Sequence, residues 1–153
     1  PSDDPYYFNA KIGTPENALF PNSPALNVGV FNAGTEKGVT DYNIAHLMVG
    51  RTLPWDLGRL FAGVYAGNHK VLVDGSGASD NTGWMVAWNS PTFGEKWVLA
   101  ADYASGDNVI GGGGLGVYYY FTKDISLLVG PVWFNDEAIN GSWKMTTQLD
   151  INF

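Results

Sequence analysis

The last ten residues of the chain, 144–153, alternate between apolar and polar side chains, and this alternation constrains the fold more than any other feature. The apolar set comprises Met145, Leu149, Ile151 and Phe153, and the polar set comprises Lys144, Thr146, Gln148, Asp150 and Asn152. Side chains of a β-strand point alternately to the two faces of a sheet. The pattern therefore predicts a strand with one apolar and one polar face.

The same period of two recurs along the whole chain, whereas helical periodicity is nearly absent. It predicts nine strands, at residues 6–12, 26–31, 42–52, 60–67, 84–89, 97–103, 115–121, 125–133 and 144–153. A chain of 153 residues fits a single domain, residues 1–153. We therefore expect an all-β fold: an antiparallel up-and-down transmembrane β-barrel of about 8–10 strands, complete or part of a larger barrel.

The connections between the predicted strands alternate in length. Short turns are expected at residues 53–56, 91–95 and 122–124, and longer loops at residues 32–41, 73–81, 104–113 and 135–142. Because successive connections of an up-and-down barrel lie at opposite ends, the short turns fall at one end and the longer loops at the other. This sorting is typical of outer-membrane barrels.

The composition agrees with a protein whose outer surface faces lipid. Only 15% of the residues are charged, against about 25% in typical soluble domains. The net charge of −7 and the scattered placement of the eight basic residues argue against a nucleic-acid partner. There is no Cys, and no run of 18 apolar residues predicts a transmembrane helix. The chain starts without Met or an apolar signal segment, so we expect a processed or truncated product.

Two sets of side chains are candidates for the surfaces of such a barrel. Aromatic residues near predicted strand ends are expected at the membrane interface: Trp55, Trp84, Trp97, Tyr103, Trp133 and Trp143. Polar residues on the opposite face of the strands are expected to line the interior: Asn9, Lys11, Asn27, Arg59, Asn89, Asp102, Lys144, Gln148 and Asp150. In a filled barrel the interior set would pair internally, and in an open barrel it would line a weakly selective channel.

No catalytic, metal or cofactor site is predicted. The sequence has no recognisable Ser/His/Asp order, carboxylate pair or nucleophile motif, so we expect no enzymatic activity. His46 and His69 lack other ligands at metal-binding spacing. The loop at residues 74–81 is rich in oxygen ligands and glycines but lacks the EF-hand spacing. A solvated loop is the favoured interpretation of that segment, and a divalent-cation site stays open.

Two stretches, residues 96–108 and 146–153, resemble the C-terminal part of a porin-like family of bacterial outer-membrane β-barrels. The resemblance implies location in the bacterial outer membrane, contact with its lipid, and passive passage of small polar solutes. It also implies that the terminal Phe153 serves as a signal read by the barrel-insertion machinery. Such barrels normally have an even number of strands. Nine strands therefore imply a miscount, at residues 69–73 or in the first segment, or a larger parent barrel.

Three alternatives remain beside the porin-like hypothesis. A small filled barrel would have a structural or adhesive role and present acidic loops at the cell surface. A soluble ligand-binding barrel of the lipocalin type would turn its apolar residues inward. A third alternative, a sheath around a partner cytochrome, is suggested by the family resemblance alone. The sequence also leaves a homo-oligomer open. The sequence does not identify a transported solute.

Overall fold

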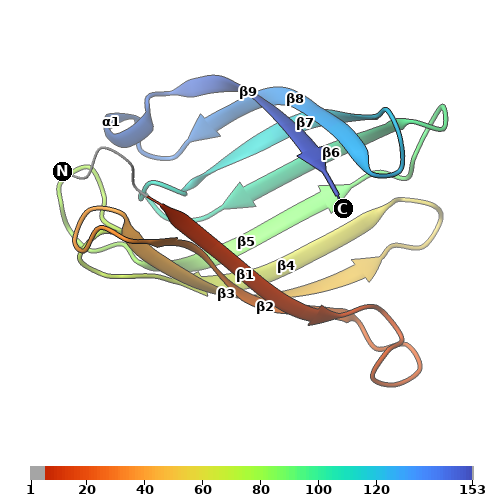
Figure 1. Cartoon of the computed structure of the whole chain (residues 1–153), viewed down its shortest axis with the longest axis horizontal. Coiled ribbons are helices and arrows are strands. Elements are labelled where there is room, and N and C mark those ends of the chain that lie inside the picture. The colour runs from red at the N-terminus through yellow and green to blue at the C-terminus, as the bar shows by residue number, and fades with distance from the viewer. Residues whose placement is uncertain (1–5, 153) are drawn as a thin grey trace.

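The computed structural model describes residues 6–152, and these form one β-sheet and one short helix (Figure 1). The elements are β1 (Tyr7–Thr14), β2 (Ala25–Gly34), β3 (Asp41–Thr52), β4 (Arg59–Ala66), β5 (Thr82–Asn89), β6 (Trp97–Ala104), β7 (Gly112–Tyr120), β8 (Ile125–Phe134), α1 (Glu137–Asn140) and β9 (Trp143–Ile151). Each strand pairs antiparallel with the next one in the chain. The predicted all-β class and nine strands are thereby confirmed.

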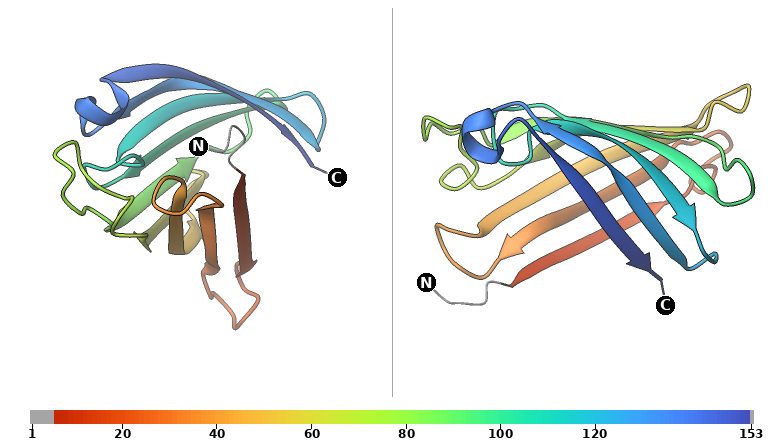
Figure 2. Two further views of the ribbon diagram at one scale, coloured as in Figure 1. Left: turned by 60° about the vertical axis from the view of Figure 1, so that its left-hand side comes forward. Right: turned by 90° about the horizontal axis from the view of Figure 1, so that it is seen from above.

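The sheet curls into a half-barrel and does not form a closed ring within the described residues. The strands are ordered from β1 to β9 across the sheet, and these two edge strands border the opening of the half-barrel (Figures 1 and 2). The curvature and the strand order of the sheet therefore agree with the predicted β-barrel, but the sheet is not closed. The count of nine also stands, because the first segment is β1 and residues 69–73 form a turn that ends in an isolated bridge from Val73 to Ser79, not a strand.

The connections are sorted by length less clearly than the sequence suggested. At one end of the sheet, here called the turn end, they comprise residues 15–24, 53–58, 90–96 and 121–124. At the other, the loop end, they comprise residues 35–40, 67–81, 105–111 and 135–142. The prediction of a long loop at 32–41 is wrong, because β2 continues to Gly34. Residues 15–24 make the turn-end connection between β1 and β2 a long one.

The helix α1 in the last loop was not predicted, and its cause is local. Asp136 precedes it, and the Asp136 side chain accepts a hydrogen bond of 2.8 Å from the backbone N–H of Ala138. This is the N-cap arrangement that favours the start of a helix. Gly141, with φ of 79°, then ends it after a single turn.

The strand register confirms the alternation that the sequence predicted. Val28 lies opposite Leu47, Leu47 opposite Val64, and Val64 opposite Trp84, so one apolar row crosses four strands. The residues between them, such as His46 and Met48, point to the other face. Because the side-chain period of a strand is two, this register places the apolar sets of all nine strands on the same face of the sheet.

The other face is the concave one, and it is packed closely at glycine positions. A hollow on this face is lined by Phe61 of β4 and by Gln148 of β9, which shows that the sheet bends around it. A Cβ atom added at Gly63 would lie 2.1 Å from the carbonyl oxygen of Leu47, and one at Gly130 would lie 1.9 Å from that of Leu115. Glycine is therefore required where the backbones approach each other so closely.

The buried core is small and lies at the loop end of the concave face. Ile44, Tyr65 and Leu72 are buried together, and partly buried Phe31, Tyr42, Met85, Val109 and Ile110 pack against them. Leu72 comes from the long loop at residues 67–81, which therefore folds inward over the concave face. Most large apolar side chains of the described strands stay exposed.

We predict that Leu72→Ala lowers the unfolding free energy by about 2–5 kcal/mol, since a fully buried leucine is lost from this core. Denaturant unfolding in detergent micelles, followed by tryptophan fluorescence, measures the change. Leu19→Ala is the matched control, because Leu19 is 55% exposed. Equal effects of the two substitutions would show that the loop does not pack on the concave face.

Candidate lumen and membrane surfaces

The convex face of the half-barrel is an exposed apolar surface. Its central side chains are roughly half exposed, as shown by Val28 at 51%, Leu47 at 49% and Val64 at 55%. In the described strands, the central positions of this face include no charged residue, and Arg51 lies close to the end of β3. Monomeric soluble proteins rarely expose contiguous apolar patches larger than a few hundred Å². A continuous apolar face over nine strands is therefore unusual for a monomeric soluble protein.

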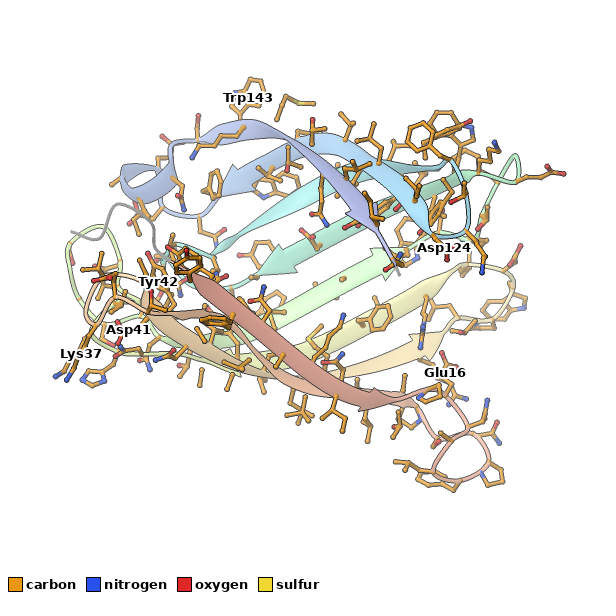
Figure 3. All side chains as sticks on the ribbon, in the orientation of Figure 1. Glu16, Lys37, Asp41, Tyr42, Asp124 and Trp143 are labelled. Carbon is orange, nitrogen blue, oxygen red and sulfur yellow. The ribbon has the colours of Figure 1, made fainter. Side chains whose placement is uncertain are left out.

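Aromatic side chains lie toward both ends of the convex face. At the loop end, the rings of Trp84 and Tyr103 are 5.1 Å apart, and Trp133 lies in register with Trp143. Figure 3 shows Trp143 directed away from the concave side. Five of the six predicted interface aromatics, Trp84, Trp97, Tyr103, Trp133 and Trp143, are thus placed on the convex face near strand ends.

The turn end has its own aromatic group. The rings of Trp97 and Tyr119 are 4.7 Å apart, and those of Tyr119 and Phe121 are 5.0 Å apart. Trp97 and Tyr103 are six residues apart on β6, which separates the two groups by roughly 20 Å along the strand. Trp55, the sixth predicted aromatic, lies in the turn at residues 53–58 and is 87% exposed. Sequence reasoning did not select Trp88, whose indole N–H donates to the Leu57 carbonyl at 2.7 Å.

The predicted interior residues lie on the concave face. This holds for Lys11, Asn27, Arg59, Asn89, Asp102, Lys144, Gln148 and Asp150, all of which share the register of that face. Asn9 lies at a β-bulge between β1 and β2, and its side-chain oxygen accepts a hydrogen bond of 2.8 Å from the N–H of Asn32. Their role in lining a water-filled interior stays a prediction.

The concave residues form local groups, not one connected network. Asn27 and His46 are joined through Oδ1 and Nε2 at 2.9 Å, and Gln148 donates to Asp150 at 2.6 Å. Arg59 lies in register with Asn89. Lys11 and Lys144 form no ion pair within residues 6–152, although the Lys144 ammonium lies 5.1 Å from the centre of the Phe134 ring.

Two hollows on the concave face meet at Asp102. One, of about 440 Å³, includes Asn89, Tyr118 and Gln148 in its lining, and the other, of about 350 Å³, includes Met48 and Phe134. Asp102 lies opposite Ala87 on one side and Gly114 on the other. These small neighbours leave the space around the carboxylate open. The described side chains therefore do not fill the concave face.

At the turn end, the connection at residues 15–24 folds back onto β3 and β4 through Glu16 (Figure 3). One Glu16 carboxylate oxygen accepts hydrogen bonds of 2.8 Å from both the backbone N–H and the hydroxyl of Thr52. The same oxygen lies 3.3 Å from Nε of Arg59. These contacts, the Thr52 hydroxyl first, hold the pKa of Glu16 below its usual value. These contacts are here called the Glu16 clamp. The sequence alone did not reveal them, because Glu16 and Thr52 are far apart in the chain.

At the loop end, three loops are joined through buried polar groups. Asn108, which is 1% exposed, donates to the hydroxyl of Tyr65 at 2.9 Å and to the carbonyl of Asp80 at 2.6 Å. The Tyr65 hydroxyl in turn donates to the Ser105 carbonyl at 2.6 Å. Asn135 donates to the carbonyl of Gly106 at 2.7 Å. Since buried polar groups are costly when unpaired, these bonds fix the loops relative to one another.

The segment at residues 74–81 is organised by its own hydrogen bonds. Asp74 Oδ1 accepts from the N–H and the hydroxyl of Ser76, at 2.9 and 2.7 Å, and from the N–H of Ala78 at 2.9 Å. These bonds, the Ser76 hydroxyl first, lower the pKa of Asp74. Within residues 6–152, no three His, Asp or Glu side chains are grouped as metal ligands.

Comparisons with known proteins add no relative. No family model matches the chain, and neither curated proteins nor solved structures give a match. Among the described residues, no helix has the length and apolar character to cross a membrane.

We predict that the Glu16 clamp weakens in acid. Because the pKa of Glu16 is lower in the folded chain than in the unfolded one, its contribution to stability is present above the unfolded pKa. That contribution is lost as the pH falls through the folded pKa. Unfolding free energies measured from pH 7 to pH 3 should therefore fall less steeply for Glu16→Gln than for the parent chain. Parallel curves for the two proteins would contradict the prediction.

Proposed function

We propose that this chain forms part of the wall of a porin-like β-barrel in the bacterial outer membrane, through which small polar solutes pass passively. The observation that carries the proposal is the continuous apolar convex face with aromatic groups toward both of its ends. Outer-membrane barrels present such a band to lipid, with aromatic girdles at the two interfaces. The resemblance of residues 96–108 and 146–153 to a porin-like family points the same way.

Contact with hydrocarbon would be energetically favourable for the convex face. Burying a Val or Leu side chain fully is worth about 1.5–3 kcal/mol relative to exposure to water. The row from Val28 to Trp84 alone contains four large apolar side chains that the chain itself leaves half exposed. Hydrocarbon would remove this cost. A charged residue at the bilayer centre would add about 2–4 kcal/mol, and the central convex positions of the described strands contain none.

The polarity of the concave face is compatible with contact with water. It carries Lys11, Arg59, Asp102, Lys144 and Asp150 beside hollows that the described side chains leave open. Both signs of charge are present, which favours weak selectivity for solutes over a strong preference for one charge. Passage of small polar solutes follows if this surface lines a continuous interior.

The alternatives from the sequence fit these surfaces less well. A lipocalin-type barrel turns its apolar side chains inward, whereas here the exposed apolar set is convex. A filled barrel with an adhesive role would have a packed interior, whereas the concave face is hollow around Asp102. The proposed partners are outer-membrane lipid and the barrel-insertion machinery. Phe153, the proposed insertion signal, lies outside the described residues.

We predict that the neighbouring residues Leu47 and Met48 of β3 face different surroundings, lipid and water, respectively. The chain has no native Cys, so Leu47→Cys and Met48→Cys each introduce a unique thiol on the convex and concave faces, respectively. In bacterial outer-membrane vesicles, a charged maleimide should label Met48→Cys, whereas Leu47→Cys should stay unlabelled until the protein is denatured, because a thiol in hydrocarbon remains protonated and only the thiolate reacts. Efficient labelling of Leu47→Cys by the charged reagent would show that the convex face meets water, and the membrane proposal would fail.

We also predict that protein extracted from outer membranes gives stepwise conductance in a planar bilayer. Asp102→Asn should lower the permeability of K⁺ relative to Cl⁻, because it removes a carboxylate from the centre of the concave face. The control is Asp124→Asn, since Asp124 lies in the exposed turn at residues 121–124 (Figure 3). Absence of steps from membrane-embedded protein would contradict solute passage and favour a structural role.

A further inference from the structure

One hollow of the concave face combines an apolar lining with a single carboxylate. It has a volume of about 350 Å³ and is lined by residues of β2, β3, β5, β6, β7 and β8, so it lies within the sheet, away from the two edge strands (Figure 1). Among the described residues that line it, Asp102 alone is charged. Sites for small molecules typically have volumes of roughly 300–1,000 Å³ and a mostly apolar lining with few polar groups. The hollow has both properties.

The shape of the hollow follows from the order of large and small residues along one row of the concave face. Met85 of β5 lies opposite Ala104 of β6. Ala104 lies opposite Gly112 of β7, and Gly112 lies opposite Phe134 of β8. Because residues of one row point to the same face, the small residues of β6 and β7 leave a floor between two large side chains. Met85 and Phe134 form the sides.

Asp102 belongs to the next row of the same face, where its two neighbours are also small. It lies opposite Ala87 of β5 and opposite Gly114 of β7. A Cβ atom added at Gly114 would lie 3.2 Å from Oδ1 of Asp102, so the missing side chain leaves this oxygen uncovered. Asp102 is exposed and forms no ion pair within residues 6–152. The carboxylate therefore faces the hollow without a counter-ion from the described chain.

The basic side chains of the concave face are placed elsewhere. Arg59 lies 3.3 Å from the carboxylate of Glu16, and Lys11 belongs to β1, which does not contribute to the hollow. The Lys144 ammonium lies 5.1 Å from the centre of the Phe134 ring. A cation within about 6 Å of an aromatic ring is attracted by the ring face. The contact of Lys144 shows that the ring beside the hollow is accessible to an ammonium group.

We propose that this hollow binds small organic cations, with an ammonium group at Asp102 and an apolar substituent against Met48, Met85 and Phe134. The proposal rests on the proposed function in one respect, because it names the class of solute that the interior favours. Methionine side chains adapt to substituents of different shape, and apolar contact adds to the attraction between the charges. An organic cation matches both parts of the lining.

Other classes of solute match only one part. Metal cations prefer several oxygen ligands, whereas the described side chains of the hollow offer one carboxylate. A neutral solute leaves that carboxylate without a counter-ion, and an anion is repelled by it. The loop end also favours cations, since its connections carry six carboxylates and two lysines. Such a field raises the local concentration of cations, and Ile110 of the loop at residues 105–111 lines the hollow.

The three methionines of the chain provide the test. Met48 and Met85 line the hollow, whereas Met145 is 59% exposed on the convex face of β9. The chain is labelled with ¹³C at the methionine methyl groups, extracted into detergent micelles and titrated with benzylammonium. We expect the NMR signals of Met48 and Met85 to shift to saturation and that of Met145 to stay. Benzyl alcohol, a neutral probe of the same size, should need an about tenfold higher concentration, since it lacks the charged contact.

Three variants assign the binding to this site. Asp102→Asn should weaken the binding of benzylammonium about tenfold, whereas Asp124→Asn removes a carboxylate from the exposed turn at residues 121–124 and should leave the binding unchanged. Ala87→Leu keeps the charge of Asp102 but fills the space beside it, and should weaken the binding of both probes. This variant replaces Asp102→Asn if the latter does not fold.

Four results would overturn the proposal. They are equal affinity for benzyl alcohol and benzylammonium, an equal shift of the Met145 signal, unchanged binding in both Asp102→Asn and Ala87→Leu, and displacement of benzylammonium by an equal concentration of K⁺. The first shows an apolar hollow without charge recognition, and the second shows uptake of the probe by the micelle. The third places the binding elsewhere, and the fourth shows attraction of any cation.

Failure of this proposal differs from failure of the proposed function. If planar bilayers show conductance steps while the Met48 and Met85 signals do not respond to benzylammonium, solute passage stands and the preference for organic cations fails. If Leu47→Cys reacts with the charged maleimide in folded protein, the membrane proposal fails, and the titration then decides only whether the hollow binds the cation.

Discussion

The structure depends on the antiparallel backbone ladder that joins each strand to the next. Every connection reverses the chain direction, and every ladder fixes which residues lie opposite one another. Since the side-chain period is two, this register places Leu47 and Val64 on one face and His46 and Tyr65 on the other. A shift by one residue in any pair would move an apolar row from the convex face to the concave one. The two surfaces are therefore consequences of the ladder.

The ends of the half-barrel are held in different ways. At the loop end, a small apolar core around Ile44 and Leu72 and the buried amide of Asn108 tie several loops together. At the turn end, one partly buried carboxylate, that of Glu16, clamps the first connection onto β3 and β4. The contacts of Glu16 depend on pH, because they require the ionised carboxylate. The long loop at residues 67–81 lies at the loop end, over the concave face.

The sequence predicted the strands and their faces because period-two alternation is a local property of the chain. It did not predict the contacts of Glu16 with Thr52 or of Asn108 with Tyr65, since these residues are 36 and 43 positions apart. The bulge at Asn9 and the one-turn helix at Glu137–Asn140 were also missed. A bulge adds one residue to one strand, which a pattern read on a single strand does not reveal. Closure was equally inaccessible, because it depends on the curvature of the sheet and on the partners of its two edges.

The parity of the strands connects the fold to the proposed function. A wall with lipid on its convex face and water on its concave face separates the two only when it is continuous around the barrel. With β1 and β9 running in the same direction, continuity through antiparallel pairs needs an odd number of strands added to the nine described. The total is then even, as in most bacterial barrels. The unpaired edges and the apolar convex face thus both support the proposed barrel, of which this sheet would form one side.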